Sequence, residues 1–176
     1  MLRHMTQDRK RHFIDELKRH YEQVISGAYR AETSAAAAAD ALRSEARTKD
    51  EAKSASSEAG LALSHRRRRQ HAKDELESLI AFAARGLPRF GRGSAVGVGA
   101  LVDVSIESED GTEERTLFLL PVGAGTELTG PGGDGFISVV TPASPVGKAL
   151  CGARAGDAVE VTTRGEHREW TIVDVI

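Results

Sequence analysis

The fold of this 176-residue chain is decided first by a short polar stretch, Arg47-Thr48-Lys49-Asp50-Glu51, which separates two helical patterns. Thr48 followed three residues later by Glu51 matches the capping box that begins a helix. Asp50 and Glu51 would also lie in a first helical turn, where the helix dipole favours anions. We therefore place a hairpin turn here and expect one helix on either side of it.

Apolar residues recur at helical spacing on both sides of the turn. The first stripe contains Phe13, Leu17, Tyr21, Val24 and Ala28, and the second contains Leu61, Leu76, Leu79, Ile80 and Ala83. Spacings of three and four residues place such side chains on one face of a helix. We expect helices over about residues 8–46 and 49–85, packed antiparallel, each roughly 55–60 Å long at 1.5 Å per residue.

The two ends of this hairpin differ in composition. Large apolar residues gather at the base, namely Phe13, Tyr21, Leu76, Ile80 and Phe82. The other end, near the turn, is charged and rich in alanine. We therefore expect it to contact a partner and to contribute little to the stability of the fold. Gly60 allows an alternative in which the helix breaks there and the tip lies at residues 54–58.

The helical pattern ends at Arg85-Gly86-Leu87-Pro88, because glycine can take the left-handed cap and proline prevents continuation. Residues 1–90 carry 18 Lys and Arg against 13 Asp and Glu, whereas residues 91–176 carry 6 against 13. Of the 18 glycines, 15 follow residue 90. The chain therefore divides into a basic helical arm, residues 1–88, and an acidic, turn-rich β domain, residues 91–176.

The second domain alternates short apolar runs with turns. Strands are expected over residues 96–106, 116–122, 136–140, 158–163 and 169–175, with turns at Asp110-Gly111 and Arg164-Gly165. Ser144-Pro145 is typical of an N-cap and first helical residue, which predicts a short helix over residues 146–150. Residues 123–135 lack the Gly-Lys-Ser/Thr end of a phosphate loop and are interpreted as a connector that includes Asp134. Together, these predicted elements indicate an α+β protein, whose second domain has an antiparallel sheet and one short helix.

Several kinds of protein are disfavoured by composition. Cys151 is the only cysteine, so an intrachain disulfide is excluded, a cysteine zinc site is not expected, and its thiol is expected to be buried. No run of about 18 apolar residues is present, and no apolar signal-peptide core follows the N-terminus. We expect a cytoplasmic protein without a membrane segment.

The densest charge run consists of Arg66, Arg67, Arg68 and Arg69. Four successive residues sweep about 300° around a helix, so at least one arginine must approach the partner helix. The run is either a phosphate-attracting patch that faces nucleic acid or a solvated face paired with acidic residues of the first helix.

A longer pattern lies in the second domain. Ile137-Ser138-Val139 is followed by Ser144-Pro145-Val146-Gly147-Lys148-Ala149-Leu150-Cys151-Gly152 and by Gly156-Asp157-Ala158-Val159-Glu160-Val161. This pattern resembles the C-terminal signature of Gre-type bacterial transcription elongation factors, and Glu169-Trp170-Thr171-Ile172-Val173 is similar to their last strand. The resemblance runs from Leu117 to Ile176 and implies an FKBP-like second domain behind a long N-terminal antiparallel two-helix coiled coil.

The resemblance also implies a partner. Gre-type factors bind bacterial RNA polymerase, with the second domain at the rim of the secondary channel and the coiled coil reaching toward the active site. Near the active site, the tip of the coiled coil would meet nascent RNA within the elongation complex. Docking is assigned to the signature region, namely Ser144, Pro145, Gly147, Gly156 and Asp157.

Acidic tip residues of the family help the polymerase to hold a second Mg²⁺ and cleave backtracked RNA. The candidate catalytic and metal-binding residues here are Asp50 and Glu51, which would share Mg²⁺ with the polymerase. Cleavage-active tips carry an Asp and a Glu three residues apart, whereas this pair is adjacent and flanked by Lys49 and Lys53. We expect no cofactor of the protein's own and no enzymatic activity without the polymerase.

Other functions stay open at this point. The chain could occupy the channel as a regulator or inhibitor without promoting cleavage. An FKBP-like peptidyl-prolyl isomerase would need an aromatic pocket, for which the second domain offers only Phe118, Phe136 and Trp170. A nucleic-acid-binding coiled coil is the third possibility, although the acidic second domain favours a protein partner. We expect a monomer.

Overall fold

The computed structural model describes residues 2–91, 93–108, 111–133, 135–163 and 165–176. Asp110, Asp134 and Arg164, which the sequence places in turns or in the connector, lie outside the described residues. The chain forms two compact units. The hairpin unit is Lys18–Glu77, and the sheet unit combines Met1–Leu17 with Ser78–Ile176.

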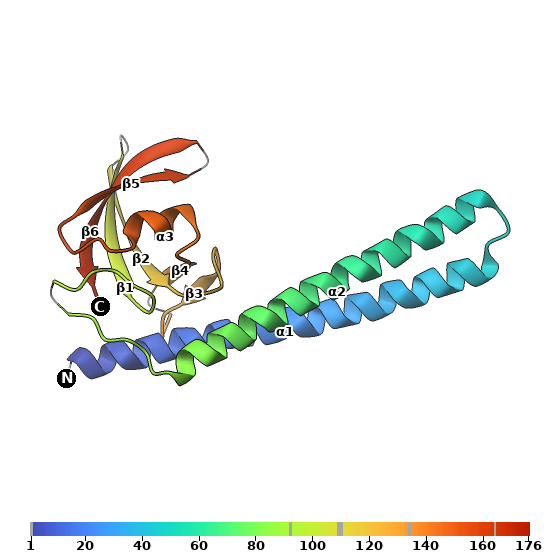
Figure 1. Ribbon diagram of the computed structural model, residues 1–176, viewed down its shortest axis with the longest axis horizontal. Helices are drawn as coiled ribbons and strands as arrows, with labels where there is room; N and C mark the ends of the chain where they lie inside the picture. The colour runs from blue at the N-terminus through green and yellow to red at the C-terminus, as the bar shows by residue number, and fades with distance from the viewer. Residues whose placement is uncertain (1, 92, 109–110, 134, 164) are drawn as a thin grey trace. The chain divides into compact units, whose positions relative to one another are not determined.

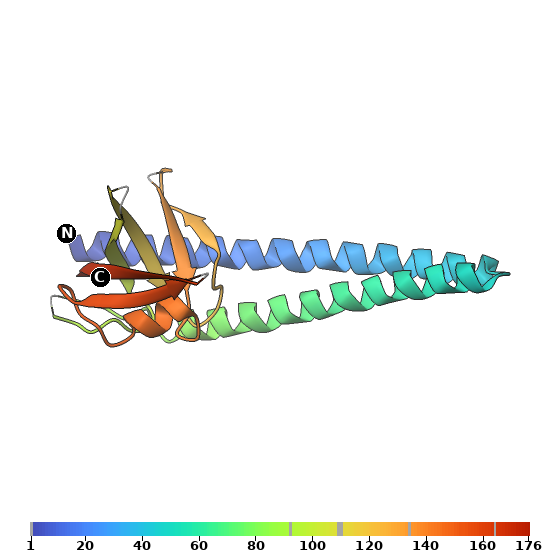
Figure 2. The same cartoon turned by 90° about the horizontal axis from the view of Figure 1, so that it is seen from above.

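Two long helices occupy the first half of the chain (Figures 1 and 2). α1 spans Leu2–Glu45 and α2 spans Lys49–Ala84, so the predicted turn next to Thr48 is confirmed. The alternative tip at residues 54–58 is wrong, because α2 continues through Gly60 without a break. α1 begins at Leu2 instead of near residue 8, since no glycine or proline stands before Gly27 to end it.

Alanine fills most of the interior of the hairpin unit. Ala39 and Ala55 are each 2% exposed, and Ala28, Ala35 and Ala72 are also buried. Small side chains let two helix backbones approach closely. Because each alanine buries little apolar area, the hydrophobic contribution of this interior to the free energy of folding is small for its length.

The sheet unit contains a six-stranded sheet in the order β3-β4-β2-β1-β6-β5. Its strands are β1 (Leu101–Ser108), β2 (Gly111–Leu119), β3 (Glu127–Thr129), β4 (Phe136–Val140), β5 (Ala158–Thr163) and β6 (Glu166–Val175). Helix α3, Pro145–Leu150, connects β4 to β5. The predicted α+β architecture is confirmed, with one correction: β2 and β4 pair in parallel, so the sheet is mixed and not wholly antiparallel.

Strand boundaries differ from the sequence expectation at several places, including β6, which begins at Glu166 and not at residue 169. β1 begins at Leu101 and not at residue 96, because residues 97–100 form a turn closed by the Ala100 N–H and the Gly97 carbonyl. β2 begins at Gly111 and not at residue 116, since its charged first half pairs with β1. β3 lies inside the expected connector. Its three residues are too few to show the alternation of apolar and polar side chains that predicts a strand.

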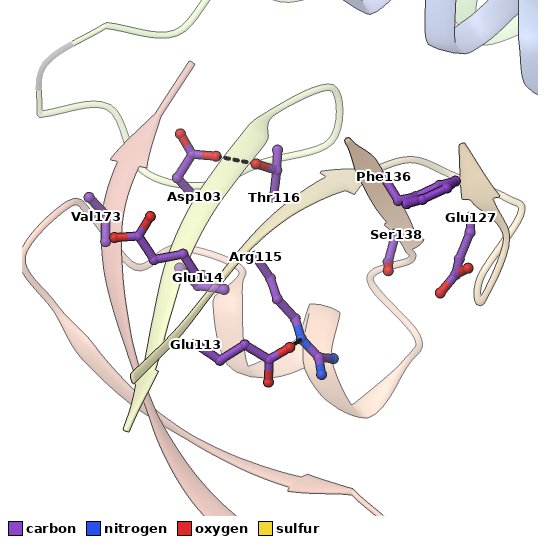
Figure 3. Close-up of a pocket in the computed structure, with 10 residues that line it drawn as sticks. Asp103, Glu113, Glu114, Arg115, Thr116, Glu127, Phe136, Ser138 and Val173 are labelled. Carbon is purple, nitrogen blue, oxygen red and sulfur yellow. Dashed lines mark hydrogen bonds and ion pairs between the residues drawn. The ribbon is translucent and has the colours of Figure 1, made fainter. Parts of the chain in front are cut away.

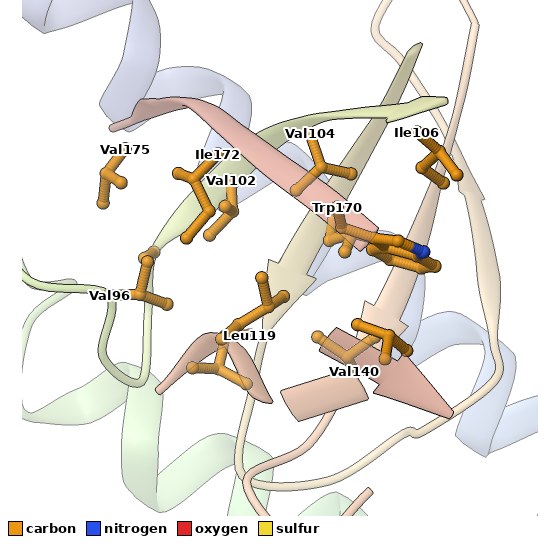
Figure 4. Packing of buried hydrophobic residues seen from close by; sticks show 13 residues of the cluster. Val96, Val102, Val104, Ile106, Leu119, Val140, Trp170, Ile172 and Val175 are labelled. Carbon is orange, nitrogen blue, oxygen red and sulfur yellow. The ribbon is translucent and has the colours of Figure 1, made fainter. Parts of the chain in front are cut away.

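The main hydrophobic core lies on one face of the sheet (Figure 4). Alternate residues of β1 contribute Val102, Val104 and Ile106, which pack with Trp170 and Ile172 of β6. Side chains at the intervening positions point to the other face. There Phe118 of β2 is fully buried, with its ring centre 6.1 Å from that of Phe13 in α1.

Two side chains in the N-terminal third of α1 also hold the edge strand β3 through polar contacts. The Glu16 carboxylate accepts the Thr129 backbone N–H at 3.0 and 3.1 Å, and His12 Nε2 lies 3.1 Å from the Thr129 carbonyl oxygen. An edge strand otherwise presents such backbone groups unpaired.

At the C-terminal end of α2, one residue that the sequence places in the core, Ile80, is exposed instead. Leu79 is fully buried, whereas Ile80 is 49% exposed. Successive helical residues point about 100° apart, so both could not face the same neighbours. None of the described helices combines the length and the apolar composition that a membrane span requires.

Candidate functional site

The tip of the hairpin unit, defined here as residues 45–54, is closed by a capping box. Glu51 Oε2 accepts the backbone N–H of Arg47 at 2.7 Å and that of Thr48 at 2.9 Å. In return, Thr48 Oγ1 accepts the Glu51 N–H at 3.3 Å. Such reciprocal bonds satisfy donors that a helix start leaves unpaired. The capping role expected for Thr48 and Glu51 is confirmed.

The two candidate carboxylates of the tip have different surroundings. Hydrogen bonds from the backbone amides of Arg47 and then Thr48 hold the pKa of Glu51 below its usual range. Asp50 is exposed, and within the described part of the chain its carboxylate makes no hydrogen bond or ion pair. One carboxylate therefore shapes the turn, and the other is available to a partner.

A Mg²⁺ ion needs several oxygen ligands around one point. Across the described residues, no three His, Cys, Asp or Glu side chains converge in this way. At the tip, one oxygen of Glu51 is already engaged by two backbone donors, and Lys49 and Lys53 flank the carboxylates in sequence. Asp50 and Glu51 therefore do not fit a metal site of the chain's own.

The arginine run on α2 has one member paired with α1. Arg69 donates from Nε to Glu32 Oε2 at 2.8 Å, and its guanidinium lies 5.6 Å from the centre of the Tyr29 ring. This hydrogen bond lowers the pKa of Glu32. Residues 66–68 are exposed. The expectation that one arginine contacts the partner helix is confirmed, and a nucleic-acid-facing role for the other three stays a prediction.

Three of the predicted docking residues hold the N-terminus of α3. Ser144 is the N-cap: its Oγ accepts the Gly147 N–H at 3.1 Å and donates to the Thr141 carbonyl at 2.8 Å. Pro145 is the first helical residue. A Cβ at Gly147 would lie 1.9 Å from the Thr141 carbonyl oxygen, so the helix can approach this carbonyl only with glycine there.

The other two predicted docking residues shape the turn before β5. Gly156 has a φ of +93° and donates its N–H to the Ile172 carbonyl at 2.8 Å. Asp157 Oδ2 accepts the Arg154 N–H at 2.8 Å. Signature residues thus act on local backbone geometry, and their contact with polymerase stays a prediction. Cys151, the C-cap of α3, is exposed, so the expectation of a buried thiol is wrong.

A groove on the sheet unit, which the sequence analysis missed, gathers acidic side chains (Figure 3). It measures about 670 Å³ and is lined by Asp103, Val104, Glu113, Glu114, Arg115, Thr116, Glu127, Phe136, Ser138 and Val173. Arg115 donates to Glu113 at 2.7 Å, and this bond lowers the pKa of Glu113. These residues come from five strands, so no local sequence signal could have revealed the groove.

The three aromatic residues considered for a proline pocket do not meet. Phe118 is buried against Phe13, and Trp170 is 6% exposed within the main core. Phe136, at the groove, is 74% exposed. An isomerase pocket needs several aromatic rings around one cavity, and these residues lie in three different environments.

Comparison with known proteins gives one family match. Residues 92–176 match the family model described as "Transcription elongation factor, GreA/GreB, C-term". Among curated proteins, none matches the chain.

Solved structures of the transcription factor Gfh1 are similar to the chain. One is 22% identical with a TM-score of 0.38, covering 88% of this chain and 92% of that chain. GreA factor homolog 1 (Gfh1) of Thermus thermophilus is 20% identical with a TM-score of 0.36, covering 89% and 94% respectively. Thermus aquaticus Gfh1 is 19% identical with a TM-score of 0.35, covering 94% of each chain.

Proposed function

We propose that the protein binds bacterial RNA polymerase and modulates elongation, since residues 92–176 match the C-terminal domain of the GreA/GreB transcription elongation factors. The family match carries the proposal, because it includes every strand from β1 to β6. The antiparallel helices before it are the other part expected of such a factor. Polymerase is cytoplasmic, so we place the protein there.

In this proposal the second domain docks at the rim of the secondary channel, and the hairpin unit enters the channel. α2 has 36 residues, which corresponds to roughly 54 Å at 1.5 Å per residue. A narrow pair of helices of this length can reach a recessed catalytic centre. The acidic second domain suits a protein surface, and the basic arm suits the nucleic acid inside the enzyme.

The chemistry in this proposal belongs to the polymerase. The protein brings no cofactor and catalyses nothing alone; any Mg²⁺ involved is held by the polymerase, and nascent RNA is the nucleic acid that the tip meets. Isomerase activity has less support, because Phe118 and Trp170 are used in packing and Phe136 lies apart from them. A role confined to nucleic acid is disfavoured by the acidity of the second domain.

A backtracked elongation complex tests the proposal. The full chain is mixed with the complex and Mg²⁺, retention on tagged polymerase is measured, and the RNA is followed in time. We expect retention and a changed rate of elongation. No retention, together with accelerated isomerisation of a proline peptide, would replace the proposal with the isomerase. Retention on free RNA but not on polymerase would replace it with nucleic-acid binding.

A further inference from the structure

We infer that Glu51 is a positioning residue that holds the tip turn and not a metal ligand, so that the chain acts on polymerase without stimulating transcript cleavage. The inference rests on the proposed function and specifies how the tip works within it. Asp50 is then the one free carboxylate of the pair. This division separates two residues for which the sequence predicted one shared role.

The Glu51 carboxylate is already engaged within the turn. Oε2 accepts two backbone N–H groups, at 2.7 Å from Arg47 and 2.9 Å from Thr48. These two amides belong to the residues that join α1 to α2. If Glu51 turned toward an ion with both oxygens, it would release both donors and the connection they order. The geometry therefore favours a role of Glu51 in holding the turn over a role as a metal ligand.

The tip also carries as many basic as acidic side chains. Residues 45–54 contain three acidic and three basic side chains, namely Glu45, Asp50 and Glu51 against Arg47, Lys49 and Lys53. A divalent cation gains no net attraction from such a set. Asp50 and Glu51 are also adjacent on α2, so their side chains leave the helix about 100° apart. Neither the charges of the tip nor the directions of the Asp50 and Glu51 side chains therefore place several carboxylate oxygens around one point, as a metal ion requires.

Three single substitutions in the full chain test the inference. Glu51→Gln keeps a side-chain oxygen for the Arg47 and Thr48 amides but removes the charge, and Glu51→Ala removes both. Glu45→Gln is the matched control, since it removes one tip charge outside the capping box. Hydrogen exchange at the Arg47 and Thr48 amides reports the turn. Retention on polymerase and RNA length in backtracked complexes report function.

We expect the wild-type chain to be retained and to alter elongation without shortening the RNA faster than polymerase alone. Glu51→Gln and the control should match it in every measurement. Glu51→Ala should accelerate exchange of the two amides about fivefold, as for a lost helix cap, and weaken the effect on elongation.

Two results would overturn the inference. The first is RNA shortening that the bound wild type stimulates above the rate of polymerase alone; its equal loss in bound Glu51→Gln and Glu51→Ala would assign it to the Glu51 carboxylate. The second is unchanged amide exchange in Glu51→Ala. Failure of the wild-type chain to bind polymerase would instead overturn the proposed function, and the exchange measurements would still decide whether Glu51 holds the turn.

Discussion

Gly147 lies so close to a neighbouring backbone that no side chain can be accommodated without movement. A Cβ there would be 1.9 Å from the Thr141 carbonyl oxygen and 2.6 Å from its carbon. We therefore expect Gly147→Ala to lower the free energy of unfolding by about 2–3 kcal/mol, as overpacking does. Gly60→Ala is the control, because nothing lies within 4 Å of its Cβ and α2 is helical there. Chemical denaturation should show the control unchanged or stabilised.

Lys10 is a second residue whose surroundings predict its behaviour. Its side chain is fully buried, with Nζ 3.2 Å from the Pro88 carbonyl and 4.9 Å from the Phe90 ring centre. Burial lowers the pKa of Lys10 from 10.5 to about 8. Between these two values the unfolded chain binds more protons than the folded chain, so this group makes stability rise with pH in that window.

Lys10→Met should remove that contribution. We expect the variant to be more stable at pH 7, by about 1 kcal/mol, because a charge is no longer desolvated. The difference between variant and wild type should shrink from pH 8 to pH 10. Thermal or urea unfolding across this range measures it, with the exposed Lys148→Met as a control that shows no such trend.

At the scale of elements, the ion pair between Arg69 and Glu32 links α2 to α1 in the hairpin unit. The two side chains are 22% and 21% exposed, and Nε donates to Oε2 at 2.8 Å. The pair Arg43–Asp40 has a similar distance, 2.9 Å, but joins residues of one helix with exposures of 64% and 76%. Solvent screens exposed pairs, so we expect the interhelical pair to be the stronger one.

Double-mutant cycles compare these two pairs. Arg69→Gln with Glu32→Gln should give a larger coupling free energy than Arg43→Gln with Asp40→Asn. The Arg69 coupling should also fall when the salt concentration rises. Equal couplings would show that the contact between the helices adds nothing to the stability of the hairpin unit.

At the scale of the whole molecule, the two units differ in how they are stabilised. Large aliphatic and aromatic side chains fill the core of the sheet unit, whereas alanine dominates the interior of the hairpin unit. We expect native-state hydrogen exchange to protect β1 and β6 most strongly and the tip end of the helices least. Uniform protection in both units would contradict this expectation and indicate one cooperative structure.

Interactions between residues close together in the chain account for the features that could be predicted correctly. The turn beside Thr48, the capping box with Glu51, the cap at Ser144 and the end of α2 before Gly86 all depend on residues a few positions apart. Such signals can be seen in the order of residues alone. The resemblance of the second domain to the GreA/GreB family also depends on the order of residues between Ile137 and Val161.

Contacts between distant residues decided the rest, and only the tertiary structure contains them. The parallel pairing of β2 with β4 and the three-residue β3 depend on neighbours elsewhere in the chain. The buried Lys10 meets the Pro88 carbonyl and the Phe90 ring, about 80 residues away in sequence, and the acidic groove exists because five strands bring its residues together. Burial and electrostatic fields sum over neighbours in space, which is why sequence spacing did not predict them.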